Sequence, residues 1–270
     1  MKRIQKTIDV DSRIDARKTR STYAFGAYNP TYKIGYLPPN LFLPGRLYPS
    51  PAPPAPEPPT DFVNIITVDI QPGASLTVSL EFNLVNPRTE TSINWGDGTI
   101  ETILSNTPIS NRYQSVGRYA IKISEPTNIS GIYASPNESV TGATLDNLTE
   151  LSEFLALDCT ALATITFPPS VDTLDIRATA VTSVTIPYGS NLTTLRADGS
   201  SLETIGGEFP DSFSYLSITY TAINTCQDLE SLVARLPTLP LTDPLTGTMD
   251  YSETTPACPL SREGWNITAF

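Results

Sequence analysis

The sequence predicts a mainly β protein that begins with an extended N-terminal arm and ends in a short repeat solenoid with a helical C-terminal cap. Three observations lead to this fold class. The 270 residues include 25 prolines and 15 glycines but only 17% charged residues, a turn-rich composition that does not suit a helical bundle. Residues 61–125 alternate in hydropathy as strands do, and a period of about 20 residues starts near residue 132. The predicted parts are residues 1–60, 61–125 and 126–270.

The composition also excludes several kinds of chemistry. Histidine is absent, which removes Ser-His-Asp and Cys-His catalytic machinery and every His-based metal site. The three cysteines, Cys159, Cys226 and Cys258, share no CxxC spacing, so we expect neither a zinc site nor a disulfide framework. We predict no cofactor and no bound metal.

Charge divides the chain into two unlike parts. Residues 1–60 hold nine basic and four acidic residues, a net charge of +5, whereas residues 61–270 carry a net charge of −16. A basic arm on an acidic body indicates an arm that meets an acidic partner surface. The acidic body would repel phosphates, and Asp9, Asp11 and Asp15 interrupt the basic run of the arm, so nucleic acid is disfavoured as a partner.

The arm has three segments. Residues 1–22 are charged, residues 23–48 scatter aromatic residues among Gly and Pro, and residues 49–60 read PSPAPPAPEPPT, which is typical of a polyproline II spacer. An unstructured tail and linker would have a similar composition. We predict a docking arm that contacts its partner through Lys2, Arg3, Lys6, Arg13, Arg17, Lys18, Arg20, Tyr23, Phe25, Tyr28, Tyr32 and Tyr36.

Neither an export signal nor a membrane span is expected. The first twenty residues carry charges throughout and lack the apolar core of about 7–15 residues that a signal peptide needs. No stretch approaches the roughly 18 apolar residues of a membrane-spanning helix. We therefore expect a protein made in the cytoplasm, used without general secretion and not inserted into a membrane.

The strand pattern of residues 61–125 surrounds a motif. One strand contains Leu76, Val78 and Leu80 on a single face, and Tyr119, Ile121 and Ile123 share a face of another. Between them, Trp95 ends a strand and the turn Gly96-Asp97-Gly98 follows. Asp97 is expected to cap its own backbone; calcium ligation is the alternative.

The run INWGDGT at 93–99, followed by NRY at 111–113 and GRYAI at 117–121, resembles the PKD family. That family has an immunoglobulin-like β-sandwich fold used as a spacer or adhesion module, so the resemblance implies a sandwich over residues 61–125. The chain departs from the family pattern by a shortened first motif and by Asn111 in place of a frequent histidine.

Four repeat segments begin at Leu155, Leu174, Leu195 and Leu216, with apolar residues at offsets 0, +2, +7 and +10. They resemble an irregular leucine-rich repeat, which implies one short strand per repeat, stacked in parallel. The usual Asn at offset +5 is replaced by hydroxyl residues that can still bond to the turn backbone: Thr160, Thr179, Ser200 and Thr221.

The C-terminal cap has two expected components. The apolar spacing in QDLESLVARL, residues 227–236, predicts a helix that Pro237 stops. Residues 241–270 are expected to close the open end of the stack, with Trp265 as the plug. Cys226 lies at a buried repeat offset and is expected to act as a small apolar residue.

Outward-facing columns of the repeat sheet form a candidate binding face. Offsets −1, +1 and +3 place there Phe154, Asp158, Asp175, Arg177, Arg196, Asp198 and Tyr215. Opposite charges alternate from rung to rung in this alignment, which is typical of a solvated ladder worth about 0–1 kcal/mol per pair. Arg177 would separate Asp158 from Asp198 and neutralise both, so we expect no paired carboxylates for catalysis and no enzyme activity.

The combination of arm, spacer-like domain and irregular repeats resembles virion proteins of tailed bacteriophages. The resemblance implies a non-enzymatic structural protein of the virion, most simply a capsid decoration or cement protein present in many copies or as a homo-oligomer. Its partners would be the major capsid protein or a neighbouring virion protein. The alternatives are a tail, neck or fibre-adaptor component, and a carbohydrate- or cell-binding adhesin for host-surface glycans, for which Phe154 and Tyr215 are the aromatic candidates.

Overall fold

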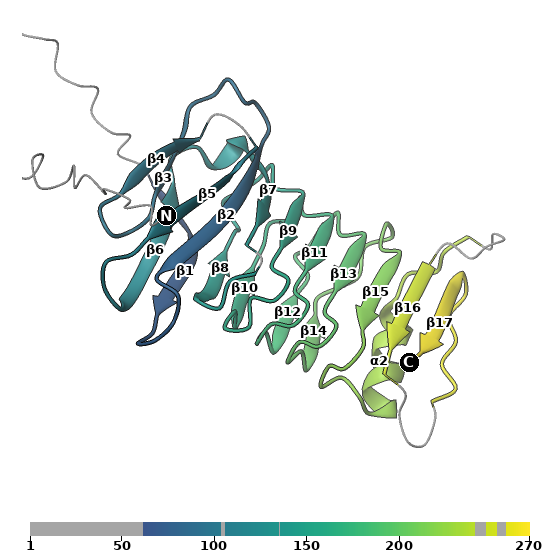
Figure 1. Ribbon diagram of the computed structural model, residues 1–270. Coiled ribbons are helices and arrows are strands. Elements are labelled where there is room, and N and C mark those ends of the chain that lie inside the picture. Colours follow the sequence, from purple (N-terminus) through teal and green to yellow (C-terminus); the bar gives the residue numbers. More distant parts are fainter. Residues whose placement is uncertain (1–61, 104–105, 135, 241–246, 253–257) are drawn as a thin grey trace, which may run out of the picture. The chain divides into compact units, whose positions relative to one another are not determined.

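The computed structural model describes residues 62–103, 106–134, 136–240, 247–252 and 258–270. The docking residues predicted in the arm lie outside these ranges. The described part is mainly β and has a single α-helix, α2 (Cys226–Arg235), and one 3-10 turn at Pro126–Asn128 (Figure 1). The strands are β1 (Val63–Ile70), β2 (Thr77–Leu84), β3 (Thr91–Asn94), β4 (Ile100–Ile103), β5 (Pro108–Arg112), β6 (Gly117–Ile123), β7 (Ile129–Tyr133), β8 (Val140–Thr144), β9 (Glu153–Leu155), β10 (Thr164–Thr166), β11 (Thr173–Asp175), β12 (Ser183–Thr185), β13 (Thr194–Arg196), β14 (Thr204–Gly206), β15 (Tyr215–Ile218), β16 (Gly247–Tyr251) and β17 (Trp265–Ala269).

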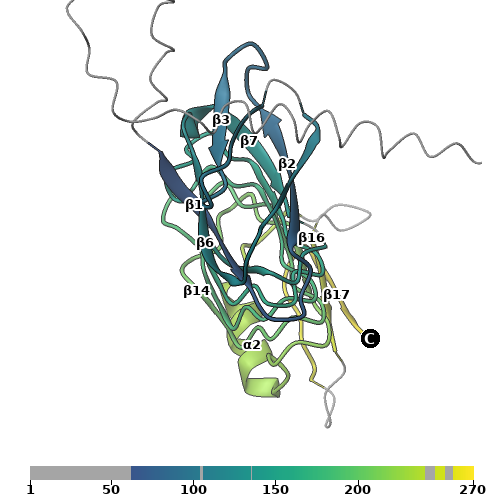
Figure 2. The same cartoon turned by 60° about the vertical axis from the view of Figure 1, so that its left-hand side comes forward.

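Two large sheets each contain strands from both sides of the predicted boundary at residue 125. One has the order β10-β8-β1-β6-β3-β4, and the other has the order β17-β16-β15-β13-β11-β9-β7-β2-β5. Figure 2 separates the layers: β1, β6 and β14 lie on one side, and β2, β16 and β17 lie on the other. Strands of residues 61–125 thus pair directly with strands of residues 126–270, as β2 does with β7. A single cluster of buried apolar side chains fills both regions.

Alternating hydropathy explains the strands around the Trp95 turn. In β2, Val78, Leu80, Phe82 and Leu84 are buried while the residues between them are more exposed. Trp95 is fully buried, and the hydroxyl of Tyr113 donates to its carbonyl at 3.0 Å. Gly96 has φ +84, and a Cβ there would lie 2.7 Å from the Ala120 carbonyl oxygen, so the turn requires glycine.

The Asp97 side chain caps the turn, as predicted. Its Oδ1 accepts from the Thr99 backbone N–H at 2.9 Å, and its Oδ2 accepts from the Asn111 side-chain amide at 2.7 Å. Burial alone would raise the pKa of this carboxyl, but the hydrogen bonds from Asn111 and Thr99 lower it below the ordinary value. The turn is thereby tied to β5.

The repeats stack in parallel, but the coils that begin with β7, β9, β11 and β13 hold two short strands instead of the predicted one, and in the coil that begins with β15 the helix α2 follows the strand. β7, β9, β11, β13 and β15 lie in the nine-stranded sheet, and β8, β10, β12 and β14 lie on the opposite side. The second set arises from the triplets TIT, SVT and TIG, in which a buried Ile or Val lies between two more exposed residues. That alternation is a strand pattern, and a repeat alignment built on widely spaced apolar offsets overlooks it.

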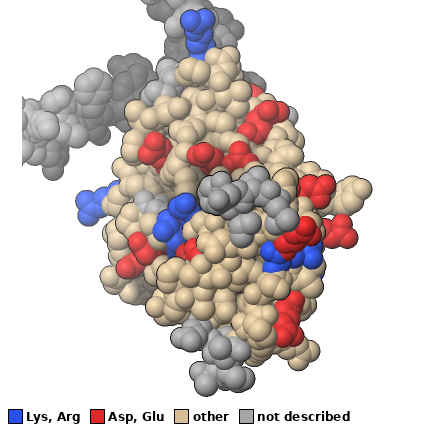
Figure 3. All heavy atoms as spheres, turned by 90° about the vertical axis from the view of Figure 1, so that its right-hand side faces the viewer, with Lys and Arg blue, Asp and Glu red and all other residues tan. Residues whose placement is uncertain are grey.

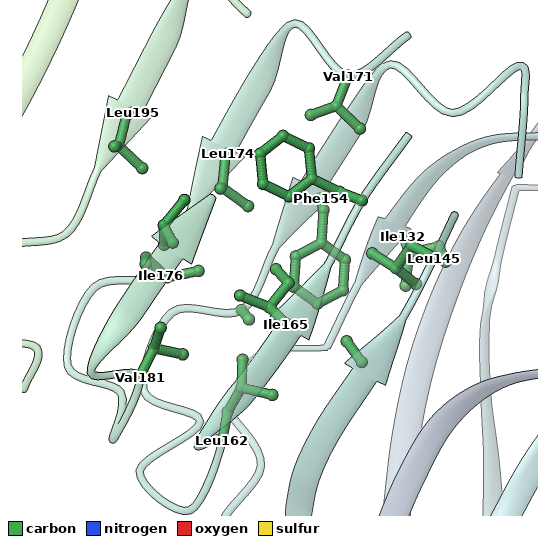
Figure 4. Packing of buried hydrophobic residues seen from close by; sticks show 14 of the residues in the cluster. Ile132, Leu145, Phe154, Leu162, Ile165, Val171, Leu174, Ile176, Val181 and Leu195 are labelled. Atoms are coloured by element: carbon green, nitrogen blue, oxygen red, sulfur yellow. The ribbon is translucent and has the colours of Figure 1, made fainter. Parts of the chain in front are cut away.

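Phe154 is fully buried, so its predicted place on the outer face is wrong. The Cα partner of Leu174 is Phe154, not Leu155, and Figure 4 shows Phe154 in the buried cluster with Leu174. The first repeat has one more residue than the others between its strand and Leu162. Because successive strand residues face opposite sides, a slip of one residue exchanges the two faces of the sheet.

Hydroxyl groups line the turns after β11, β13 and β15, as predicted for three of the four repeats. The buried Thr179, Ser200 and Thr221 donate to the backbone carbonyls of Ile176, Ala197 and Ile218, at 2.7, 2.6 and 2.9 Å. In the first repeat the slip puts Cys159 in this position, where its thiol donates to the Ala134 carbonyl at 3.1 Å. Thr160 is instead exposed.

A substitution pair can test this column. Thr179→Val should lower the free energy of unfolding by about 1 kcal/mol, because it removes a buried donor with little change of volume. The matched change Thr160→Val should have an effect near zero. Chemical denaturation of both variants measures the difference, and equal effects would contradict the assignment of Thr179 to the buried turn.

The helix α2 lies where the sequence predicts it, and Leu229, Leu232 and Val233 form its buried face. The Thr225 side chain caps its N-terminus by accepting from the Asp228 backbone N–H at 3.2 Å. Beyond the helix, β16 and β17 add two parallel strands to the nine-stranded sheet. Among the described residues, β17 is therefore the edge strand at this end of the sheet. Trp265 of β17 is buried, and its indole N–H donates to the Pro237 carbonyl at 2.9 Å.

Cys226 differs from its prediction as a small apolar residue. It is only partly buried and forms a disulfide with Cys258, which joins the start of α2 to the segment before β17. The two Cα atoms lie 5.5 Å apart, within the range that a disulfide spans. The expectation of a chain without disulfides is therefore wrong. Cys159 remains as a buried free thiol, and burial raises its pKa to about 12.

Candidate functional site

The outer face of the nine-stranded sheet brings five of the predicted site residues together. Asp175 ends β11, Arg196 ends β13 and Tyr215 begins β15, while Arg177 and Asp198 follow their strands by two residues. Cα pairing places Asp175 beside Arg196 and Arg196 beside Ser217. The resulting set, which we call the face network, comprises Asp175, Arg177, Arg196, Asp198, Tyr215, Ser217, Thr219 and Asp250.

Asp175 and Arg177 form a bidentate ion pair within one coil. The Arg177 Nε lies 2.9 and 3.0 Å from the two carboxylate oxygens of Asp175, and Nη2 lies 2.6 Å from Oδ2. Asp175 is 1% exposed and the Arg177 side chain is 33% exposed. The hydrogen bonds that Arg177 donates to Asp175 raise the pKa of the guanidinium. Both members of the pair belong to the same coil, and Asp175 is buried. The prediction that Asp175 forms a solvated charge ladder with the neighbouring coil is therefore wrong.

Asp198 uses its carboxylate inside the network. Its Oδ1 accepts from the Ser217 hydroxyl, from the Thr219 hydroxyl and, at 3.0 Å, from the Thr219 backbone N–H. These bonds tie the turn after β13 to the next coil. Asp198 therefore has a structural role in joining adjacent coils.

Tyr215 lies between a cation and a carboxylate. The guanidinium carbon of Arg196 lies 5.3 Å from the centre of the Tyr215 ring, and the Tyr215 hydroxyl donates to Asp250 at 3.4 Å. Burial, followed by the charge of Asp198, raises the pKa of Asp250, although the bond from Tyr215 acts in the opposite direction. Sequence reasoning missed Asp250, which lies in β16 next to Met249, the strand partner of Leu216. The separation in sequence between these two partners is much longer than the repeat period of about 20 residues, so the period does not predict β16.

Two predicted face residues lie elsewhere. Phe154 is in the core, as described above. Asp158 is exposed, but it has φ +60 in the turn after β9, which matches Ala178 at φ +54 and Tyr220 at φ +57 in later coils. It therefore does not share a column with Arg177 and Asp198, and the predicted Asp158–Arg177–Asp198 alternation is wrong. Asp158 lines a separate groove of about 410 Å³ with residues that include Ser75 and Asn137.

The burial of Asp175 changes the expected result of a charge exchange. A solvated ladder would predict less than about 1 kcal/mol for Asp175→Arg combined with Arg196→Asp. Since Asp175 is buried and paired with Arg177, the double change should now lower the free energy of unfolding by more than about 2 kcal/mol. The single change Arg196→Ala, at an exposed position, should cost less than about 1 kcal/mol. A neutral double exchange would contradict the buried ion pair.

Sequence reasoning also missed the two aromatic side chains that are most exposed among the described residues. Tyr188 is 97% exposed and Tyr220 is 75% exposed, both in turns of the solenoid. Tyr188 lies in the turn Pro187–Ser190, where proline and glycine flank it; that turn signal could have revealed its position.

The described residues hold no group of three or more Cys, Asp or Glu side chains arranged to bind a metal ion. Among those residues, no helix is both long and apolar enough to span a membrane. On the face that Figure 3 presents, Lys and Arg side chains lie close to Asp and Glu at several points.

No protein-family model matches the chain, and neither do curated proteins or solved structures to a significant degree.

Proposed function

We propose that the protein is a non-enzymatic structural component of a tailed-bacteriophage virion, a capsid decoration or cement protein that its N-terminal arm anchors to the particle. The observation that carries this proposal is the charge division between the arm, at +5, and the rest of the chain, at −16. Opposite charge steers a basic arm toward an acidic shell, while the acidic remainder stays exposed to solvent.

The described residues suit the displayed part of such a protein. Strands from residues 61–125 pair with strands from residues 126–270 through backbone hydrogen bonds, so the described residues can be carried as one body. The carboxylates Asp175 and Asp198 of the face network are bonded to neighbouring side chains. This arrangement supports a structural role for the face more than a catalytic one.

We further propose that residues 61–125 are a PKD-like, immunoglobulin-like sandwich and that residues 126–270 are an irregular leucine-rich-repeat solenoid capped by α2. The contact between Tyr113 and Trp95 and the Asp97 turn support the first assignment. The column of buried hydroxyls supports the second.

Charge reversal in the full chain tests the anchor. A triple variant, Arg13→Glu, Arg17→Glu and Arg20→Glu, should rebind at least about tenfold more weakly to particles that lack the protein, because each change replaces an attraction with a repulsion. Rebinding of the unaltered chain should weaken as salt is added. Centrifugation of particles with bound protein measures occupancy.

The matched control reverses three exposed arginines outside the arm: Arg88→Glu, Arg112→Glu and Arg118→Glu. This variant has the same net charge as the arm variant and should keep normal occupancy. If the arm variant also keeps it, the anchor lies in residues 61–270 and the proposal fails. Quantitative mass spectrometry then separates a shell protein in many copies from a tail, neck or adaptor component in few copies.

A further inference from the structure

The second face of the solenoid is interrupted between two strands. β10 pairs with β8, and β12 pairs with β14, but within residues 136–240 no ladder joins β10 to β12. Each of these strands therefore has an edge without a partner strand. On the other face, β9, β11, β13 and β15 pair without a break.

A groove of about 540 Å³ lies at this interruption. Its lining includes the exposed hydroxyl residues of both strands and the loop before β12: Thr164, Thr166, Thr182, Ser183 and Thr185. The Thr166 hydroxyl donates to the carboxylate of Asp146, which also lines the groove. The volume is within the range of about 300–1,000 Å³ that is usual for small-ligand sites.

A second groove of about 430 Å³ shares Pro187 with the first. Its lining includes Tyr188 together with the carboxylates of Glu208 and Asp211. The turn that carries Tyr188 is closed by a bond from the Ser190 N–H to the Pro187 carbonyl at 3.2 Å, and Gly189 has φ +70. The turn thus holds the tyrosine ring at the rim of the groove with almost all of its surface in water.

The fold does not require an aromatic residue at this position. The same kind of turn recurs at Pro168–Val171 and Pro210–Phe213, closed by bonds of 3.3 and 2.9 Å. The residues that correspond to Tyr188 in those turns are Pro169 and Asp211, and both are exposed. Tyr188 therefore presents apolar ring surface that the packing of the solenoid does not use.

We propose that the two grooves form a binding site for a neutral oligosaccharide. Hydroxyl and carboxylate groups provide both donors and acceptors for sugar hydroxyls, and the exposed face of Tyr188 can pack against the apolar face of a sugar ring. An anionic ligand is disfavoured, because the described lining of the grooves has Asp146, Glu208 and Asp211 but neither Lys nor Arg. An apolar peptide would cover the exposed hydroxyls of the groove without offering them hydrogen-bond partners.

This site goes beyond the structural role proposed above and does not depend on the arm. Its test uses the isolated full chain, so its failure and the failure of anchoring are separate results. The probe is a set of immobilised neutral oligosaccharides of glucose, galactose, mannose and N-acetylglucosamine, alongside sialylated and sulfated oligosaccharides.

At least one neutral oligosaccharide should bind in preference to the charged ones. Tyr188→Ser should weaken that binding by at least about tenfold, whereas Tyr188→Phe, which keeps the ring, should remain within about twofold of the unaltered chain. Thr166→Val combined with Thr185→Val should also weaken binding, because it removes two hydroxyls from the groove. The matched control is Tyr220→Ser, which removes an exposed tyrosine from a different turn and should leave binding unchanged.

Three results would overturn the proposal. The first is that no neutral oligosaccharide binds with a dissociation constant of about 1 mM or lower, which corresponds to roughly 4 kcal/mol of binding free energy. The second is preferential binding of the sialylated or sulfated oligosaccharides. The third is unchanged binding by Tyr188→Ser. Thermal unfolding of Tyr188→Ser should match that of the unaltered chain, which establishes that lost binding reflects the lost ring.

Discussion

Phe154→Ala should lower the free energy of unfolding by about 3–5 kcal/mol, which is a large part of the stability of a typical domain. The phenyl ring is fully buried in the cluster between the coils, and its Cα partners are Ile132 and Leu174. Its removal leaves a cavity that the stacked strands on both sides cannot readily fill, because their backbones are held in hydrogen-bonded ladders. Urea denaturation measures the change.

Leu155→Ala is the matched control, one residue further along the same strand. Leu155 is only partly buried, so its truncation should cost about 1 kcal/mol or less. The repeat alignment that starts at Leu155 makes the opposite prediction, in which Leu155 is the core residue. A larger effect for Leu155 than for Phe154 would contradict the register of β9 against β11.

Replacing both Cys226 and Cys258 by serine should lower the free energy of unfolding by about 3–4 kcal/mol. The disulfide joins residues separated by 32 positions, and this loop includes α2 and β16. Without the bond, the unfolded chain gains conformational entropy, and that gain is the source of the expected loss. A reducing agent should destabilise the unaltered chain by a similar amount and leave the double variant unchanged.

Thiol counting provides an independent check on the pairing. Burial raises the pKa of Cys159 to about 12, so its thiol is protonated at neutral pH and should resist alkylation in the folded chain. Unfolding without a reducing agent should expose one reactive thiol, and unfolding with one should expose three, as mass spectrometry can record. Three reactive thiols without reduction would show that Cys226 and Cys258 are not bonded.

Local pattern was sufficient for much of the architecture. The alternation in β2, the tight turn after Trp95, the parallel stacking of the repeats and the helix α2 all follow from spacings of a few residues. The hydroxyl residues at three of the repeat turns were also predictable, because each donates to the equivalent backbone carbonyl of its own coil. These features depend on contacts between close neighbours in sequence, or on a spacing that repeats.

The candidate site depended on more than local pattern. Arg196 and Tyr215 could be placed on one face from the period of the repeats, but the extra residue before Leu162 shifted Phe154 and Asp158 out of the expected columns. Asp250 could not be found, because the long step from β15 to β16 interrupts the period.

Periodicity in the sequence therefore determined which elements form and how the coils stack, because the buried and exposed positions of each coil appear as a pattern of apolar and polar residues. The tertiary structure decided the register of β9, the choice of Arg177 as the partner of Asp175, the pairing of Cys226 with Cys258 and the gap between β10 and β12. The physical reason is that side chains alternate across a strand and a shift of one residue reverses them, while the partners across a ladder or a disulfide are selected by positions in space that no local spacing specifies.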